Sequence, residues 1–156
     1  MKWLNFILSH SIFISLCAFA LCLQTFWLLH IRTDYIVTAL IFFATLGSYN
    51  FYWLISKYYF DTSASLKNFL VKNFSNLVLF LLASVGIIYC LITLPGVLKN
   101  VAIASLLTLL YSVPLWPLKA LAFTRKAGFL KTTLLAFTWT YVTVMIPAYN
   151  VTVYNK

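Results

Sequence analysis

Five apolar stretches dominate this chain of 156 residues, and most of them are long enough to cross a lipid bilayer as helices. One crossing takes roughly 20 apolar residues, because the hydrocarbon core is about 30 Å thick. The stretches cover residues 3–29, 35–56, 69–94, 101–116 and 129–149, and the fourth is the shortest. With 63% hydrophobic and 8% charged residues, the chain does not have the composition of a soluble domain. We therefore expect residues 1–156 to form a single transmembrane domain.

The apolar stretches are expected to be helices and not strands of a barrel. A helix satisfies its own backbone hydrogen bonds within lipid, whereas an open sheet edge does not. Barrel strands alternate polar and apolar residues, and the run from Leu77 to Ala83 does not alternate. The sequence predicts an all-α fold, a polytopic transmembrane bundle of about five helices.

The basic residues are distributed unevenly between the two sides that such a bundle would have. One side carries only Arg32, Lys99 and Lys156. The other side holds the remaining eight, which are Lys2, Lys57, Lys67, Lys72, Lys119, Arg125, Lys126 and Lys131. Because cytoplasmic loops are enriched in Lys and Arg, we expect the N-terminus and the basic loops to be cytoplasmic. The net charge of +9 then reflects orientation in a lipid bilayer, and nucleic acid is not an expected partner.

The first stretch also has features of a signal peptide. Lys2 precedes the apolar run, and Ala18-Phe19-Ala20 resembles a cleavage site. The run nevertheless continues to Leu29, which is longer than the apolar region of most signal peptides. We expect the stretch to remain in the protein as a membrane helix.

The chain contains few residues with which to perform catalysis. Asp34 and Asp61 are its only acidic residues, and His10 and His30 would lie about 30 Å apart along one helix. We find no sequence motif for a metal site, a phosphate-binding loop or a catalytic nucleophile. The three cysteines, which are Cys17, Cys22 and Cys90, are expected to be small packing residues. The sequence therefore predicts no catalytic residue, no metal ligand and no cofactor.

Two stretches carry polar residues at positions where a ligand could bind. Asn50 lies in the inner half of the second stretch, where it either joins helices beside Gly47-Ser48 or lines a ligand site. Tyr111 and Lys119 lie at the inner end of the fourth stretch, followed by two further basic residues, Arg125 and Lys126. That cluster suits an anionic headgroup or a diphosphate. The same positive charges would also be expected if they served only to orient the chain in the bilayer. Trp139, deep in the fifth stretch, faces a helix interface, a cavity or lipid.

Together the two stretches resemble the UbiA-type prenyltransferases, which are all-helical membrane enzymes. Tyr111-Ser112-Val113-Pro114 followed by Leu118-Lys119 is similar to a short signature at the end of that family's fourth helix. Asn50 falls where the family begins its first aspartate-rich motif. The resemblance implies the first five of nine helices, an inward-facing site and an isoprenoid or prenyl diphosphate ligand, with Asn50, Tyr111, Lys119, Arg125 and Lys126 as ligand-binding residues.

The chain departs from this family at the residues that hold magnesium. Phe51, Leu54 and Tyr58 stand where the family has aspartates, and magnesium held by those aspartates neutralises the diphosphate leaving group. An active family member would need magnesium, so we expect no prenyl transfer by this chain alone. Half of a bundle would also leave an interface open, which a homo- or hetero-oligomer would close.

Two other functions remain open on the sequence. The first is a structural or accessory subunit of a larger membrane complex, in which Asn50, Gly47 and Gly86 would be packing residues. The second is half of a transporter, for which the only indication is the helix-breaking prolines.

Overall fold

The structure is a computed structural model that describes residues 11–60, 71, 73–112 and 128–149. These residues form five helices, which are α2 (Ile12–Leu28), α3 (Tyr35–Phe60), α5 (Phe74–Thr93), α6 (Leu98–Ser112) and α8 (Gly128–Thr140). A 3-10 turn, η1 (Pro95–Val97), joins α5 to α6, and a π-helical turn, η4 (Tyr141–Met145), continues α8. The described ranges contain no strand. The predicted all-α fold with about five helices is confirmed.

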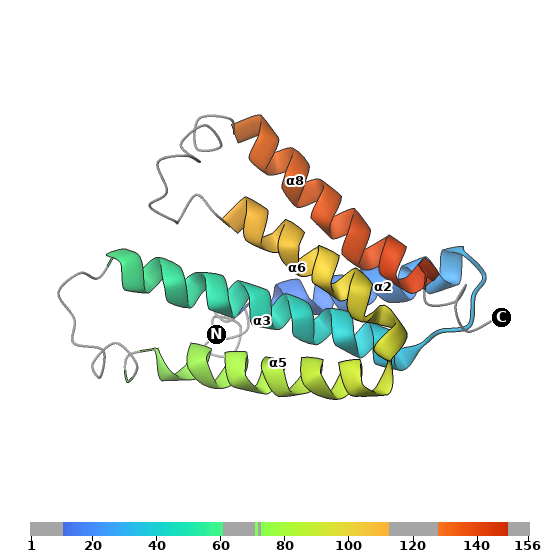
Figure 1. The fold of residues 1–156 in the computed structure, drawn as a ribbon, viewed down its shortest axis with the longest axis horizontal. Helices are drawn as coiled ribbons and strands as arrows, with labels where there is room; N and C mark the ends of the chain where they lie inside the picture. Colours follow the sequence, from blue (N-terminus) through green and yellow to red (C-terminus); the bar gives the residue numbers. More distant parts are fainter. Residues whose placement is uncertain (1–10, 61–70, 72, 113–127, 150–156) are drawn as a thin grey trace.

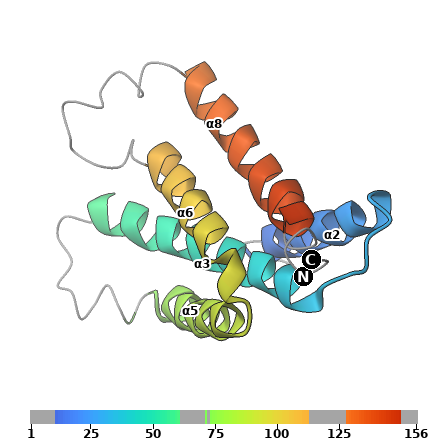
Figure 2. The same cartoon turned by 45° about the vertical axis from the view of Figure 1, so that its right-hand side comes forward.

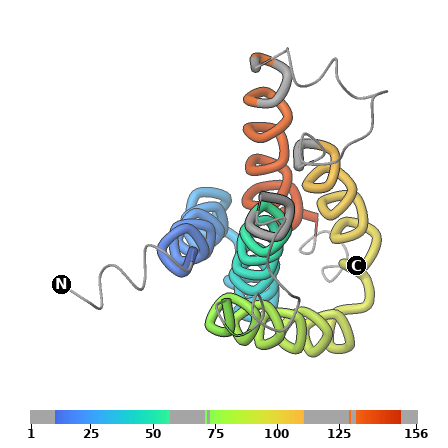
Figure 3. Tube along the Cα trace, turned by 90° about the vertical axis from the view of Figure 1, so that its left-hand side faces the viewer, coloured from blue at the N-terminus to red at the C-terminus, as the bar shows by residue number. Residues whose placement is uncertain are grey.

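Successive helices run in alternating directions along the long axis of the molecule (Figure 1). Helix α3 is the centre of the bundle, with the other four helices around it (Figure 3). It packs against α5 and α2, whereas α6 packs mainly against α8 and η4 contacts α2. Figure 2 shows α5 beneath α3, on the side away from α6 and α8.

The start of α3 is fixed by one of the chain's two aspartates. The Oδ1 atom of Asp34 accepts hydrogen bonds from the backbone N–H groups of Ile36 (2.9 Å) and Val37 (3.2 Å). These N–H groups lie in the first turn, where a helix has no carbonyl to offer them. One of the two acidic residues therefore serves as a helix cap.

Small residues let α3 and α5 approach closely. A Cβ atom added at Gly47 would lie 3.5 Å from the Cβ of Ala83, and one added at Gly86 would lie 2.6 Å from the ring of Phe43. One turn further along, the rings of Phe51 and Phe80 stack with their centroids 5.5 Å apart. Gly86 is thus required by the close approach of an aromatic ring.

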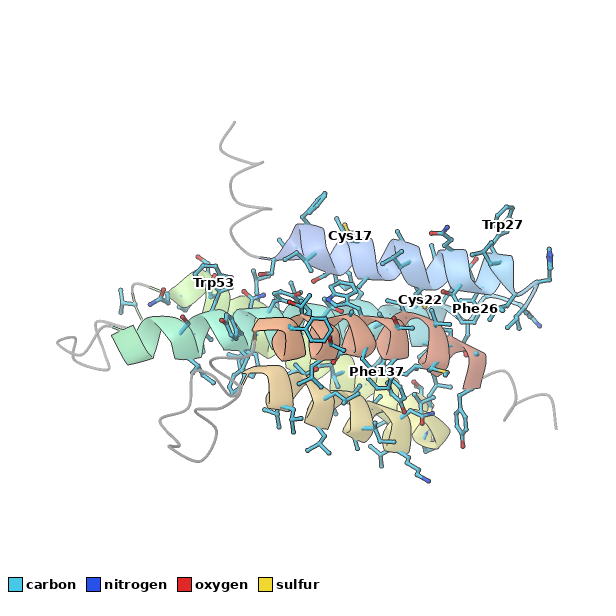
Figure 4. The ribbon with its side chains drawn as sticks, turned by 90° about the horizontal axis from the view of Figure 1, so that it is seen from above. Cys17, Cys22, Phe26, Trp27, Trp53 and Phe137 are labelled. Atoms are coloured by element: carbon cyan, nitrogen blue, oxygen red, sulfur yellow. The ribbon has the colours of Figure 1, made fainter. Side chains whose placement is uncertain are left out.

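Helix α2 buries Ser15, Ala18 and Cys22 against the bundle, whereas Cys17 is only half-buried. Cys22 and Phe26 are fully buried, and the thiol of Cys22 donates to the hydroxyl of Thr38 at 3.7 Å. Trp27 is 75% exposed and points away from the other helices (Figure 4). Cys22 and Cys90 belong to the hydrophobic core, which confirms their predicted role in packing.

Two helices of the described chain are both long and apolar enough to span a membrane. They cover Tyr35–Ser56 and Phe74–Thr93. The stretches Ile12–Leu28 and Pro95–Leu110 are apolar but shorter.

Candidate ligand cavity

A cavity of about 80 Å³ lies among α3, α6 and α8 and is partly open to the outside. It exists because α6 and α8 pair with each other and make only sparse contacts with α3. Its lining follows the helical period, as on α6, where Val101, Ala104, Ser105 and Thr108 line it. Residues spaced by three and four positions share one helix face, so each helix presents a single stripe to the cavity.

The lining is mostly aliphatic, with polar groups from all three helices. The polar groups are hydroxyls and one indole, on Thr45, Ser48, Tyr49, Ser105, Thr108, Thr138 and Trp139. No Lys, Arg, His, Asp or Glu is among the described residues that line the cavity. An apolar pocket with a few convergent polar groups is the usual form of a small-molecule site.

The threonine hydroxyls of the lining use their hydrogens within their own helices. Thr45 donates to the carbonyl oxygen of Ile41 at 2.8 Å, and Thr138 donates to that of Leu134 at 2.8 Å. A hydroxyl has one hydrogen to donate and two lone pairs with which to accept. These two threonines therefore present hydrogen-bond acceptors to the cavity.

Tyr49 and Trp139 connect α3 to α8 across the cavity. Both side chains belong to its lining. An indole N–H can only donate a hydrogen bond, whereas a phenolic hydroxyl can both donate and accept. Trp139, whose environment the sequence left open, thus lines the cavity.

An irregular turn of helix lies beside the same cavity. The π-helical turn η4 contributes Val142 to the lining, and Ile146 follows it. At its start, the hydroxyl of Tyr141 donates to Oδ1 of Asn100 at 3.3 Å. Such turns insert a residue into an α-helix and occur often at functional sites.

The predicted site residue Asn50 is buried but does not line the cavity. It is 1% exposed, and its Nδ2 donates to the carbonyl oxygen of Leu46 at 2.8 Å. At about 100° per residue it lies about 60° around α3 from Gly47, which faces α5, and about 160° from Ser48, which lines the cavity. This position suits helix packing, and a role in ligand binding stays a prediction.

The other predicted site residues are not described in enough detail to be placed in a site. Tyr111 belongs to the last turn of α6, and its side chain lies outside the described part. Lys119, Arg125 and Lys126 lie outside the described residues altogether.

The hydroxyl residues that line the cavity are not among the site residues predicted from the sequence. Their signal is a stripe at helical spacing, Thr45-Ser48-Tyr49 on α3 and Ser105-Thr108 on α6. Within the described ranges, no group of three or more His, Cys, Asp or Glu could hold a metal ion. Comparison with protein-family models, curated proteins and solved structures finds no match to this chain.

Proposed function

We propose that this chain is an integral membrane protein that holds an isoprenoid or similar lipid-like molecule among α3, α6 and α8. All five helices cross the bilayer in this proposal, with the N-terminus and the basic loops in the cytoplasm. The observation that carries the binding function is the partly open cavity with its mixed aliphatic and hydroxyl lining.

The distribution of apolar and polar side chains supports insertion in lipid. Large apolar side chains face outward on several helices, among them Val85 (66% exposed), Ile92 (75%) and Leu106 (61%). Polar side chains such as Thr38 (0%) and Asn50 (1%) are buried instead. Soluble monomers rarely expose apolar patches of this extent, whereas lipid solvates them.

Aromatic and charged residues near the helix ends support the orientation. Trp27 and Tyr35 are exposed on either side of the loop that joins α2 to α3, where interfacial aromatic residues are expected. Arg32 and Lys99 belong to the same end of the bundle, because the helices alternate in direction (Figure 1). That end is the side that the charge distribution assigns to the exterior.

The relationship to the UbiA-type prenyltransferases remains part of this proposal and rests on the sequence resemblance. A divergent first half of such a bundle would retain an apolar cavity for an isoprenoid chain. It would lack the aspartates that hold magnesium, so we propose binding without prenyl transfer.

Photo-crosslinking tests whether the cavity binds an isoprenoid. The detergent-solubilised protein is irradiated with a prenyl probe that carries a diazirine and an alkyne, and the labelled peptides are identified by mass spectrometry. We expect labelling on α3, α6 and α8. Ala104→Phe, at a buried position of the lining, should reduce the labelling at least fivefold because the new ring fills the cavity.

Two further variants make this experiment decisive. Ala102→Phe places the same ring on an exposed position of the same helix and should leave labelling unchanged. Ala44→Phe fills the cavity from α3 and replaces Ala104→Phe if that variant does not fold. Equal labelling of the two cavity-filling variants and the unmodified protein would refute the proposed function.

An accessory subunit of a membrane complex is the second candidate, and α5 is the element that favours it. Its membrane-length segment is only 17% buried within the chain, so its outer face is available to a partner helix. Cysteine cross-linking from Val85→Cys in native membranes tests this candidate. A single cross-linked partner protein would support this candidate. Reaction of the new cysteine with lipid-soluble thiol reagents, without any discrete cross-linked protein, would count against it.

A further inference from the structure

We propose that the cavity selects a neutral lipid with a hydroxyl head, namely a prenyl alcohol, over the corresponding prenyl diphosphate. This inference rests on the proposed function and specifies its ligand. It depends on the charge, the hydrogen-bonding character and the size of the cavity.

The charge of the cavity disfavours an anion. Of the described residues that line it, none carries a formal positive charge. A diphosphate within this lining would lose hydration without gaining an ion pair, which costs far more than burying a neutral hydroxyl that keeps its hydrogen bonds. A neutral head avoids this cost.

The hydrogen-bonding groups of the cavity are complementary to an alcohol. Tyr49 lies in the lining and has a hydroxyl hydrogen to donate. Thr45, one helical turn before Tyr49, has its hydrogen committed to Ile41 and can only accept. An alcohol accepts one hydrogen bond and donates another, so a single hydroxyl head satisfies both residues. A diphosphate that is fully ionised has nothing to donate to Thr45.

The size of the cavity fits a head group and not a whole lipid. A cavity volume of about 80 Å³ compares with the roughly 10–15 Å³ that, on the same measure, holds one water molecule. It therefore accommodates a hydroxyl and a few carbon atoms. Because the cavity is partly open, the rest of an isoprenoid tail would leave between the helices and lie against aliphatic side chains or lipid.

Displacement of the photo-crosslinking probe tests the selectivity. The competitors are a prenyl alcohol, the diphosphate of the same chain length with and without magnesium, and the hydrocarbon that lacks a head group. We expect the alcohol to displace the probe at a concentration at least tenfold lower than either of the others requires. Tyr49→Phe should remove about a fivefold to tenfold advantage of the alcohol over the hydrocarbon, because one hydrogen bond is lost.

Two more variants separate the hydrogen bond from a general loss of structure. Thr45→Val should weaken the preference for the alcohol in the same direction, since it removes the oxygen that accepts the alcohol's hydrogen. Tyr52→Phe, on the same helix but outside the lining, should leave the preference unchanged.

The possible outcomes distinguish this inference from the function on which it rests. Stronger displacement by the diphosphate, with or without magnesium, would overturn the inference and leave isoprenoid binding intact. Equal displacement by alcohol and hydrocarbon would also overturn it. If no competitor displaces the probe and Ala104→Phe does not reduce labelling, the proposed function fails as well.

Discussion

At the scale of single residues, the described polar side chains divide into those that serve the helices and those that line the cavity. Asp34 belongs to the first group, since its carboxylate receives the first N–H groups of α3. Tyr49 belongs to the second, since its side chain is part of the lining. In a chain with only two acidic residues, this division leaves hydroxyls as the main polar groups of the cavity.

The cap at Asp34 leads to a prediction about the local stability of α3. Asp34→Ala should destabilise the first turn by about 1 kcal/mol, which corresponds to about fivefold faster exchange of the amides of Ile36 and Val37. Hydrogen–deuterium exchange with mass spectrometry on the peptide that begins at Tyr35 measures this. Asp34→Asn retains a capping oxygen and should exchange nearly as slowly as the unmodified protein. Equal exchange in Asp34→Ala and the unmodified protein would show that the cap contributes nothing.

At the scale of elements, the sequence predicted the positions of the helices along the chain better than it predicted which helix faces pack against one another. The predicted stretch 69–94 contains α5, and the stretch 35–56 lies within α3, because long apolar runs determine helices locally. The cavity depends on how three separate helices pair, and apolar runs without a strongly polar face do not specify that pairing. Asn50 is predicted as a site residue because it is polar. The residues of α3 that line the cavity lie on another part of its surface.

The contact between α3 and α5 gives a prediction with a matched control. Gly86→Ala should lower the free energy of unfolding by about 1–3 kcal/mol, because the new methyl group overlaps the ring of Phe43. Gly47→Ala meets only ordinary contacts at 3.5 and 3.6 Å and gains up to about 1 kcal/mol of helix propensity. Thermal unfolding in detergent compares the two variants. A Gly86→Ala protein as stable as Gly47→Ala would contradict the close packing of Phe43.

At the scale of the whole molecule, the alternating direction of the helices determines at which end of the bundle each described basic residue lies. Lys57 and Lys131 lie near the ends of α3 and α8 at one end of the bundle, and Arg32 and Lys99 belong to the opposite end. The topology predicted from the sequence assigns eight basic residues to the first side and three to the second. In the proposed membrane topology this difference has a reason, because positive residues are retained on the cytoplasmic side.

This separation predicts which positions are reached from each side of a membrane. In a variant whose Cys17, Cys22 and Cys90 are replaced by alanine, single cysteines are introduced by Arg32→Cys, Lys99→Cys, Lys57→Cys and Lys131→Cys. In intact expressing cells, a membrane-impermeant maleimide should label positions 32 and 99, because both belong to the end that the proposed topology places outside. Positions 57 and 131 should react only after the membrane is permeabilised, and the cysteine-free protein should not react.

Each departure from this labelling pattern has a distinct physical meaning. Labelling of positions 57 and 131 alone would reverse the orientation while preserving the crossings, so the charge asymmetry would have been misread. Labelling of all four positions in intact cells would mean that the bundle does not cross the bilayer. The exposed side chains of α5, such as Val85 and Ile92, would then have to be covered by protein, and the accessory-subunit function would become the better explanation of the fold.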